Sequence, residues 1–170
     1  MELAALLEAR RSVRAFDGKP VEGDKIRQIL ELTNLAPSAG NLQAYEIFHV
    51  TAPRARAALA RAADQSYLAE APDVLVFFAN PGRSARKYGS RGKDLYAIQD
   101  ATIAATYAML AATNLGLSTV WVGAFDPAKV TAAVGAPPDW VPVAVLPIGR
   151  GSEAPGPTSR RSLDDLVRTI

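Results

Sequence analysis

Cysteine is absent from this chain of 170 residues. Its absence excludes disulfides, thiolate zinc sites, iron–sulfur clusters and a cysteine nucleophile, and it fits a protein of the reducing cytoplasm. Histidine occurs once, as His49, inside a segment that reads as a strand. A packed or partly exposed histidine is a better interpretation of that position than a catalytic acid. We therefore expect no metal site and no side-chain nucleophile of this kind.

Long apolar runs and a large net charge are also lacking. The longest nearly apolar stretch, residues 101–112, is too short to cross a bilayer. Residues 1–16 carry acids inside the apolar run and basic residues after it, the reverse of a secretory signal. The net charge of +2 is a weak basis for nucleic-acid binding, although the basic residues are grouped in a few clusters. The sequence thus predicts a cytoplasmic protein without a membrane or nucleic-acid partner, and basic clusters suited to a small anion.

The order of the expected elements indicates an α+β fold. Helices are predicted near residues 3–10, from residue 26 to near Pro37, and over 53–64 and 95–115; strands are predicted over 44–51, 73–79, 118–125 and 141–149. Because helices and strands do not alternate regularly, a doubly wound parallel sheet is disfavoured. We expect a single domain over residues 1–170.

Four segments carry more specific expectations. Residues 73–79 form a continuous apolar run and should be a central strand. Pro142 and Pro147 make 141–149 an edge strand or a bulged partner. Residues 80–94 read as a basic, glycine-bearing loop, and the proline- and glycine-rich residues 151–170 read as an arm laid over a surface.

The octamer "ARRSVRAF", residues 9–16, is a first candidate binding segment. In an extended chain, alternation places Arg10, Ser12 and Arg14 on one side, together with Phe16. Guanidinium groups with a hydroxyl between them suit a phosphate, because arginine donates planar, charge-assisted hydrogen bonds. A solvated basic turn at the end of a helix is the alternative, and the octamer alone favours it.

A second candidate is the polar loop within "LAPSAGNLQAYEIFHV", residues 35–50. Its small residues would let a planar ligand approach the backbone. Ser38, Asn41 and Gln43 offer hydrogen bonds of both senses, which suit sugar hydroxyls or the edge of a heterocycle. Ordinary loop chemistry is the alternative.

Taken together and in order, the motifs resemble the nitroreductase family of flavin enzymes over essentially the whole chain. They are "RRSVRAF", "APSAGNLQAYEIFHV", "LYAIQDATIAATYAMLAATNLGLS", "VWVGAF", "LPIG" and "RRSLDDLV". The resemblance implies a three-layer α+β homodimer with a mainly antiparallel sheet flanked by helices and FMN at the dimer interface. It also implies that residues 151–170 contact the partner subunit.

The same resemblance assigns a cofactor site in parts. The FMN phosphate would be bound by Arg10, Ser12 and Arg14, with Arg11 a weaker candidate because alternation points it elsewhere, and by Arg160 and Arg161 of the terminal arm. A phosphomonoester carries close to two negative charges, which such a set of arginines would balance.

The remaining matches concern the flavin ring. The residues that match the loop against the isoalloxazine ring and ribityl chain, supplied in the family by the other subunit, are Pro37, Ser38, Ala39, Asn41 and Gln43. Val122 and Gly123 match the segment whose backbone N–H reaches flavin N5. Gln99 is a further candidate to face the cofactor, whereas Asp100 could equally be an acid favoured by the helix dipole.

The implied activity is a ping-pong hydride transfer. NADH or NADPH reduces FMN at N5, and a nitroaromatic, quinone or similar flat acceptor is then reduced in the same pocket, with no catalytic side chain required. Basic residues 83–93 could meet an anionic substrate or a nicotinamide phosphate, or they could be a solvated loop. A flavin-binding redox sensor or partner-interaction module that turns over no small acceptor is the alternative function. The sequence fixes neither the acceptor nor the choice between NADH and NADPH.

Overall fold

A computed structural model describes residues 2–170. Its centre is a four-stranded sheet in the order β1-β2-β4-β3, in which every pair of neighbours is antiparallel. The strands are β1 (Tyr45–Val50), β2 (Asp73–Ala79), β3 (Ser118–Thr119) and β4 (Val141–Gly149). With helices on both faces, this arrangement confirms the predicted α+β fold.

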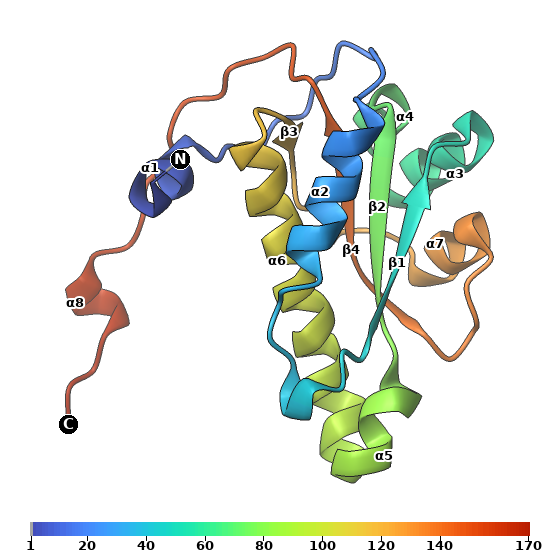
Figure 1. The fold of residues 1–170 in the computed structure, drawn as a ribbon, viewed down its shortest axis with the longest axis vertical. Helices are drawn as coiled ribbons and strands as arrows, with labels where there is room; N and C mark the ends of the chain where they lie inside the picture. Colours follow the sequence, from blue (N-terminus) through green and yellow to red (C-terminus); the bar gives the residue numbers. More distant parts are fainter. Residues whose placement is uncertain (1) are drawn as a thin grey trace.

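Helices cover the sheet from both sides (Figure 1). In chain order the helices are α1 (Leu3–Ala9), α2 (Gly23–Thr33), η1 (Ala39–Asn41), α3 (Pro53–Ala63), α4 (Tyr67–Glu70), α5 (Pro81–Arg91), η2 (Gly92–Tyr96), α6 (Ala97–Asn114), α7 (Pro127–Val134) and α8 (Leu163–Leu166). Helices α2 and α6 lie against one face, and α3, α4 and α7 lie against the other. No helix among the described residues combines the length and apolar character needed to cross a membrane.

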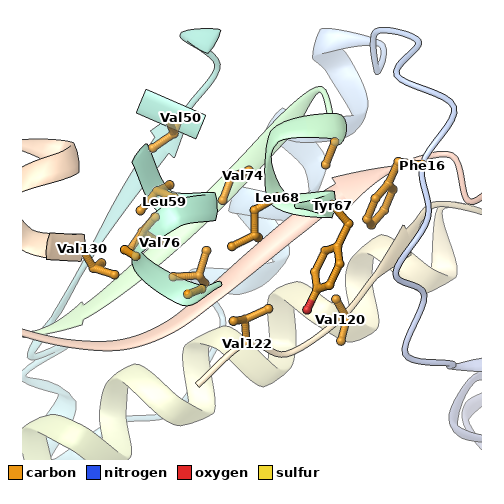
Figure 2. Close-up of a cluster of buried hydrophobic side chains, with 14 of the residues drawn as sticks. Phe16, Val50, Leu59, Tyr67, Leu68, Val74, Val76, Val120, Val122 and Val130 are labelled. Carbon is orange, nitrogen blue, oxygen red and sulfur yellow. The ribbon is translucent and has the colours of Figure 1, made fainter. Parts of the chain in front are cut away.

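The continuous apolar run of β2 is explained by burial on both faces. Val74, Val76 and Phe78 join the core beneath α3, α4 and α7, whereas Leu75 and Phe77 join the core beneath α2 and α6. All of these side chains are fully buried. Figure 2 shows part of the first core, where Phe16 and Tyr67 close the end nearest the N-terminal segment. The prediction of a central strand over 73–79 is confirmed.

Of the two alternatives predicted for 141–149, the bulged partner is confirmed and the edge strand is excluded. Strand β4 lies between β2 and β3, and its register with β2 shifts between Phe77 and Phe78, next to Pro142. Val145 exchanges both backbone hydrogen bonds with Val122, at 2.9 and 3.1 Å. Backbone groups two residues apart in a strand point to the same side, so the missing N–H of Pro147 would point toward Val122 and β3, as that of Val145 does. The proline therefore removes no hydrogen bond between β4 and β2.

Two other predicted segments differ from the structure. Strand 118–125 is reduced to Ser118–Thr119 and the isolated bridge at Val122. Residues 80–94 are not a loop, because α5 begins at Pro81 and continues through the π-helical turn η2 into α6. Pro81 occupies the first turn, and the Asn80 side chain accepts a hydrogen bond from the Arg83 N–H at 3.1 Å. The proline and the asparagine cap favour helix formation more than the glycines oppose it. Gly89, with φ of 57°, introduces a kink in the helix.

Candidate functional site

The N-terminal segment and the C-terminal arm enclose a cavity of about 610 Å³. After α1 the chain is extended: the Val13 N–H donates to the Thr119 carbonyl at 3.2 Å, and Phe16 pairs with Gly151. Val13 and Phe16 are buried, which fixes the segment to the body of the molecule. The residues that line the cavity include Arg10, Arg11, Ser12, Arg14, Thr158 and Arg160, and also the acidic Glu8.

The arginines of this cavity are held mainly by backbone groups. Arg160 donates to the Thr158 carbonyl at 3.1 Å and to the Ser159 carbonyl at 2.9 Å. The backbone N–H of Arg14 donates to the Glu153 carboxylate. Among the ion pairs found within residues 2–170, none includes a side chain of Arg10, Arg14 or Arg160. Their charges are therefore available to an anion.

Arg11 and Arg161 do not lie where alternation and spacing place them. Arg11 lines the cavity beside Arg10, because its guanidinium folds back over the end of α1 and donates to the carbonyls of Glu8 and Arg10. Alternation is kept only in part, because Arg11 also borders a separate, small cavity together with Val13. Arg161 instead donates to the Asp165 carbonyl at 2.7 Å and is not among the residues that line the cavity.

A second cavity, of about 520 Å³, lies between the loop before β1 and the start of α6. Its lining includes Pro37, Ser38, Ala39, Tyr96 and Gln99. Of the five loop residues predicted from the sequence, Pro37, Ser38 and Ala39 line this cavity together with Gln99, whereas Asn41 and Gln43 do not. The apolar character of Pro37 and Ala39 leaves a surface suited to the face of a flat molecule.

Asp100 is the residue of this region that the sequence left undecided. Its carboxylate is 1% exposed and accepts the Ala39 N–H at 2.9 Å and the Ala44 N–H at 3.1 Å. It therefore fastens both ends of the loop to α6. An acid inside a helix that is apolar nearly all round needs such partners, and that is the signal that could have identified it. Burial raises the pKa of Tyr45, and the negative charge of Asp100 raises it further.

The loop itself contains a run of left-handed backbone. Gly40 and Asn41 both have φ of 56°, and Gln43 has φ of 49°. The Ser38 hydroxyl accepts the Gln43 N–H at 2.9 Å and stabilises this turn. Left-handed conformations at Asn41 and Gln43 cost free energy, and such residues cluster where backbone groups serve ligands.

The backbone at Val122 and Gly123 shows which of these two residues has an N–H group free for a ligand. Val122 is buried, and its N–H donates to the Val145 carbonyl at 3.1 Å. That N–H is therefore committed to the sheet. Gly123 is exposed, and an added Cβ would lie 3.1 Å from Trp121 Nε1, so the position favours glycine. Of the two residues, Gly123 is the one whose N–H a ligand could use.

The two cavities lie toward opposite ends of α6. Arg11 and Val13 border a small cavity with Thr113 near the helix C-terminus, whereas the loop is fastened at Asp100 near its N-terminus. Positions 100 and 113 are roughly 20 Å apart along a helix. One chain therefore does not bring the arginines and the loop together.

His49 Nε2 lies 2.7 Å from Asp73 Oδ1, and neither residue is among those that line the two cavities. Within residues 2–170, no cluster of three or more histidine, aspartate or glutamate side chains is arranged to hold a metal ion. Burial raises the pKa of Tyr67, and the nearby Arg14 guanidinium only partly opposes that effect.

Comparisons with known proteins give a consistent result. A model of the nitroreductase family matches residues 7–73 and 60–150. A protein of Thermus thermophilus named NADH dehydrogenase is 32% identical, over 93% of this chain and 91% of its own length. A 5,6-dimethylbenzimidazole synthase of Rhodobacter capsulatus is 30% identical, over 86% of this chain and 82% of its own. The structure of the Vibrio harveyi NADPH:FMN oxidoreductase complexed with NAD+ is 26% identical and superimposes with a TM-score of 0.88, covering 98% of this chain and 76% of the other.

Proposed function

This chain belongs to the nitroreductase family, and from that premise we propose that it is an FMN-dependent NAD(P)H oxidoreductase that reduces flat oxidised acceptors such as quinones and nitroaromatics. The acceptor and the order of the half-reactions are part of the proposal. The observation that carries it is the arginine-lined cavity, because Arg10, Arg14 and Arg160 enter none of the ion pairs found within residues 2–170.

That cavity fits the phosphate of FMN. Arg10, Arg14 and Arg160 supply charge-assisted donors, and Ser12 and Thr158 add hydroxyl groups. A phosphomonoester bears close to two negative charges at neutral pH, which the guanidinium groups would balance. Glu8, which also lines the cavity, opposes this charge, but the arginines outnumber it. Arg161 has a weaker case than Arg160, because its donor is already directed at Asp165.

The loop of residues 37–43 supplies the other part of the proposed site. Because the loop and the arginines lie toward opposite ends of α6, a complete site needs the loop of a second copy of the chain. We therefore place FMN at the interface of a homodimer, with the C-terminal arm of one subunit against the other. The loop would lie against the ring, with Gln99 beside it, and the Gly123 N–H would be directed at the ring from the sheet.

When bound, FMN would supply the redox chemistry, accepting a hydride from NADH or NADPH and passing electrons to the acceptor. The chain would act by position. The arginines fix the phosphate, Asp100 holds the loop in shape, and Pro37 and Ala39 leave an apolar floor on which flat molecules stack. No described side chain is needed as a nucleophile or general base.

One relative favours a second candidate activity. The Rhodobacter capsulatus protein is named a 5,6-dimethylbenzimidazole synthase, and it matches most of this chain. The competing function of a redox sensor without a small-molecule acceptor is favoured only by the exposed C-terminal arm. Product analysis separates the three: an oxidised donor with reduced quinone, release of 5,6-dimethylbenzimidazole, or neither.

The first test is an anaerobic visible spectrum of the purified protein. We expect flavin absorption that bleaches when NADH or NADPH is added and returns when a quinone follows. A protein that stays colourless after reconstitution with FMN would contradict the proposal. A protein that bleaches but is never reoxidised by quinones or nitroaromatics would leave the redox sensor as the better function.

The phosphate assignment has its own test. The double variant Arg10→Ala with Arg14→Ala should lose FMN during gel filtration while its far-ultraviolet circular dichroism stays unchanged. The matched control is Arg54→Ala with Arg61→Ala, which removes the same charge from exposed positions of α3. Equal FMN retention by the two double variants would refute the assignment.

A further inference from the structure

Helix α5 carries a cationic surface that the proposed FMN site does not use. It consists of Arg83, Arg86, Lys87 and Arg91 of α5 and of Lys93 in η2, all exposed, and we call it the α5 cationic surface. Between residues 81 and 96 the only acid is Asp94. None of the ion pairs found within residues 2–170 involves these five cations, whereas Arg27 of α2 is paired with Glu31.

Folding alone gives no reason for this arrangement. Like charges three and four residues apart on a helix, as at positions 83, 86 and 87, destabilise it. Surface helices normally mix both signs, as α2 does with its Arg27 and Glu31. A concentration of charges of one sign beside a cavity is typical of a surface that attracts an oppositely charged ligand.

The α5 cationic surface adjoins the cavity where the flavin ring is proposed to lie. The Arg83 Nε donates to the Leu42 carbonyl in the loop. A Cβ added to Gly40 would lie 2.7 Å from Lys87 Nζ, so that ammonium group touches the loop backbone. At the other end, Arg91 Nε donates to the Tyr96 hydroxyl at 3.0 Å, and Tyr96 lines the cavity.

Aromatic side chains join the charge to the cavity. Tyr88 and Tyr96 pack edge to face with ring centroids 5.2 Å apart. Lys87 Nζ lies 5.4 Å from the Tyr88 ring centroid, and the Arg91 guanidinium lies at the same distance from Tyr96. If a molecule placed a flat ring in the cavity and its phosphate groups outside, the ring would lie near the tyrosines and the phosphates near the cations.

We propose that the α5 cationic surface binds the 2′-phosphate of the nicotinamide dinucleotide, so that the protein prefers NADPH to NADH. This inference rests on the proposed function, since it assumes that a nicotinamide ring enters the cavity. The 2′-phosphate is the one charged group that distinguishes the two donors, and it is a phosphomonoester with close to two negative charges. The arginines of the first cavity are not available to it, because the FMN phosphate occupies them.

Arg86 and Lys87 are the residues to change. Both are exposed, and neither donates any of the described hydrogen bonds, unlike Arg83 and Arg91. Alanine is the best helix former, so Arg86→Ala with Lys87→Ala should keep α5 intact. The control is Arg54→Ala with Arg61→Ala, which makes the same change of charge on α3, across the sheet from α6.

Steady-state kinetics with an uncharged quinone provides the first measurement. We expect the wild-type KM for NADPH to be about five- to tenfold below that for NADH, as two exposed ion pairs allow. The Arg86/Lys87 variant should lose that difference through a higher KM for NADPH, with kcat and the KM for NADH nearly unchanged. Added salt should raise the KM for NADPH in the wild type and the control more than in the variant.

A binding measurement separates this inference from the proposed function. Calorimetric titration of the holoprotein with adenosine 2′,5′-bisphosphate should show binding that 5′-AMP does not match and that the Arg86/Lys87 variant lacks. Equal KM values for the two donors in the wild type, or an equal loss in the control, would overturn the inference while leaving the oxidoreductase intact. A protein without flavin would contradict the proposed function, whereas equal affinity of the wild-type and variant holoproteins for the bisphosphate would contradict this inference alone.

Discussion

Asp100 is the side chain on which the shape of the candidate site depends most directly. It is buried in α6, and both of its carboxylate oxygens accept backbone N–H groups from the loop, at Ala39 and Ala44. Hydrogen bonds to a charged acceptor are about twice as strong as neutral ones. No other described contact ties both ends of the loop to one atom group.

Asp100→Asn should therefore loosen the loop. The amide keeps one acceptor but turns an NH2 group toward a backbone N–H, and the lost hydrogen bond in a buried place should cost about 1–3 kcal/mol. Urea denaturation would measure the loss, and hydrogen exchange at Ala39 and Ala44 would show where it occurs. Asp94→Asn, an exposed acid in η2, is the control and should change neither.

Asp126 provides a prediction about pH. Its side chain caps α7 by accepting the backbone N–H groups of Ala128 and Lys129. The hydrogen bond from the Lys129 backbone lowers the pKa of Asp126, and burial only partly opposes that effect. A depressed pKa in the folded state means that the stabilisation is complete above the ordinary aspartate value, about pH 4. It is lost as pH falls through the lower, folded value.

Asp126→Asn should remove this part of the acid dependence while keeping the cap, because asparagine caps helices as well as aspartate does. Thermal melts between pH 2 and 7 would compare the two proteins. A wild type and a variant whose melting temperatures fall in parallel over the acid range would show that Asp126 contributes nothing to it.

Helix α5 and the π-helical turn after it pack so closely that glycine is required between them. A Cβ on Gly92 would lie 2.6 Å from the Ser84 carbonyl oxygen, a backbone atom that cannot move aside easily. Gly82, in the first turn of the same helix, has its nearest such neighbour at 3.8 Å. The two glycines therefore differ in packing while sharing one element.

Gly92→Ala should lower the free energy of unfolding by about 1–3 kcal/mol through overpacking. Gly82→Ala should be neutral or stabilising by up to about 1 kcal/mol, because alanine is the better helix former. Chemical denaturation of both variants makes the comparison. A Gly82→Ala protein as unstable as Gly92→Ala would show that the kinked helix, and not the close contact, sets the cost.

How well the sequence predicted each element depended on which force determines it. Strand β2 and helix α6 were predicted because burial on several sides leaves an uninterrupted apolar pattern. Helix α5 was missed because its cap at Asn80 and Pro81 is local and was outweighed by glycine and charge. The sequence left β4 as either an edge strand or a bulged partner, because the cost of a proline depends on which neighbouring strand its missing N–H would face.

The candidate site divides in the same way. Arg10, Ser12 and Arg14 could be grouped from a short motif, and the structure places them on one cavity. The role of Asp100 required knowing that residues 39 and 44 return to α6, a contact across 61 positions in sequence. The choice of Gly123 over Val122 required the bridge to Val145.

The protein as a whole has two extensions that pack poorly on its own body. Helix α1 and the segment bearing α8 project from the rest of the chain (Figure 1). Their apolar side chains are exposed, with Leu3 at 65%, Leu7 at 53% and Leu163 at 74%. Side chains of this kind gain free energy when another surface covers them, which in the proposed homodimer is the second subunit.

Deleting residues 157–170 should therefore affect assembly more than folding. We expect unchanged far-ultraviolet circular dichroism, a monomer by light scattering, and weak FMN retention because Arg160 is lost. Deleting only residues 168–170 is the control and should leave the dimer and the flavin in place. A long deletion that remains dimeric and yellow would show that the arm has no part in either.

The separation of the two cavities along α6 has a genetic consequence. In the proposed homodimer each complete site takes its arginines from one chain and its loop from the other. A chain damaged at Arg10 and Arg14 and a chain damaged in the loop would each be inactive alone. When the two chains are co-expressed, they should form a mixed dimer with one intact site and one site that carries both defects. Two defective alleles would therefore complement each other, and the mixed dimer should have about half the activity of the wild-type dimer.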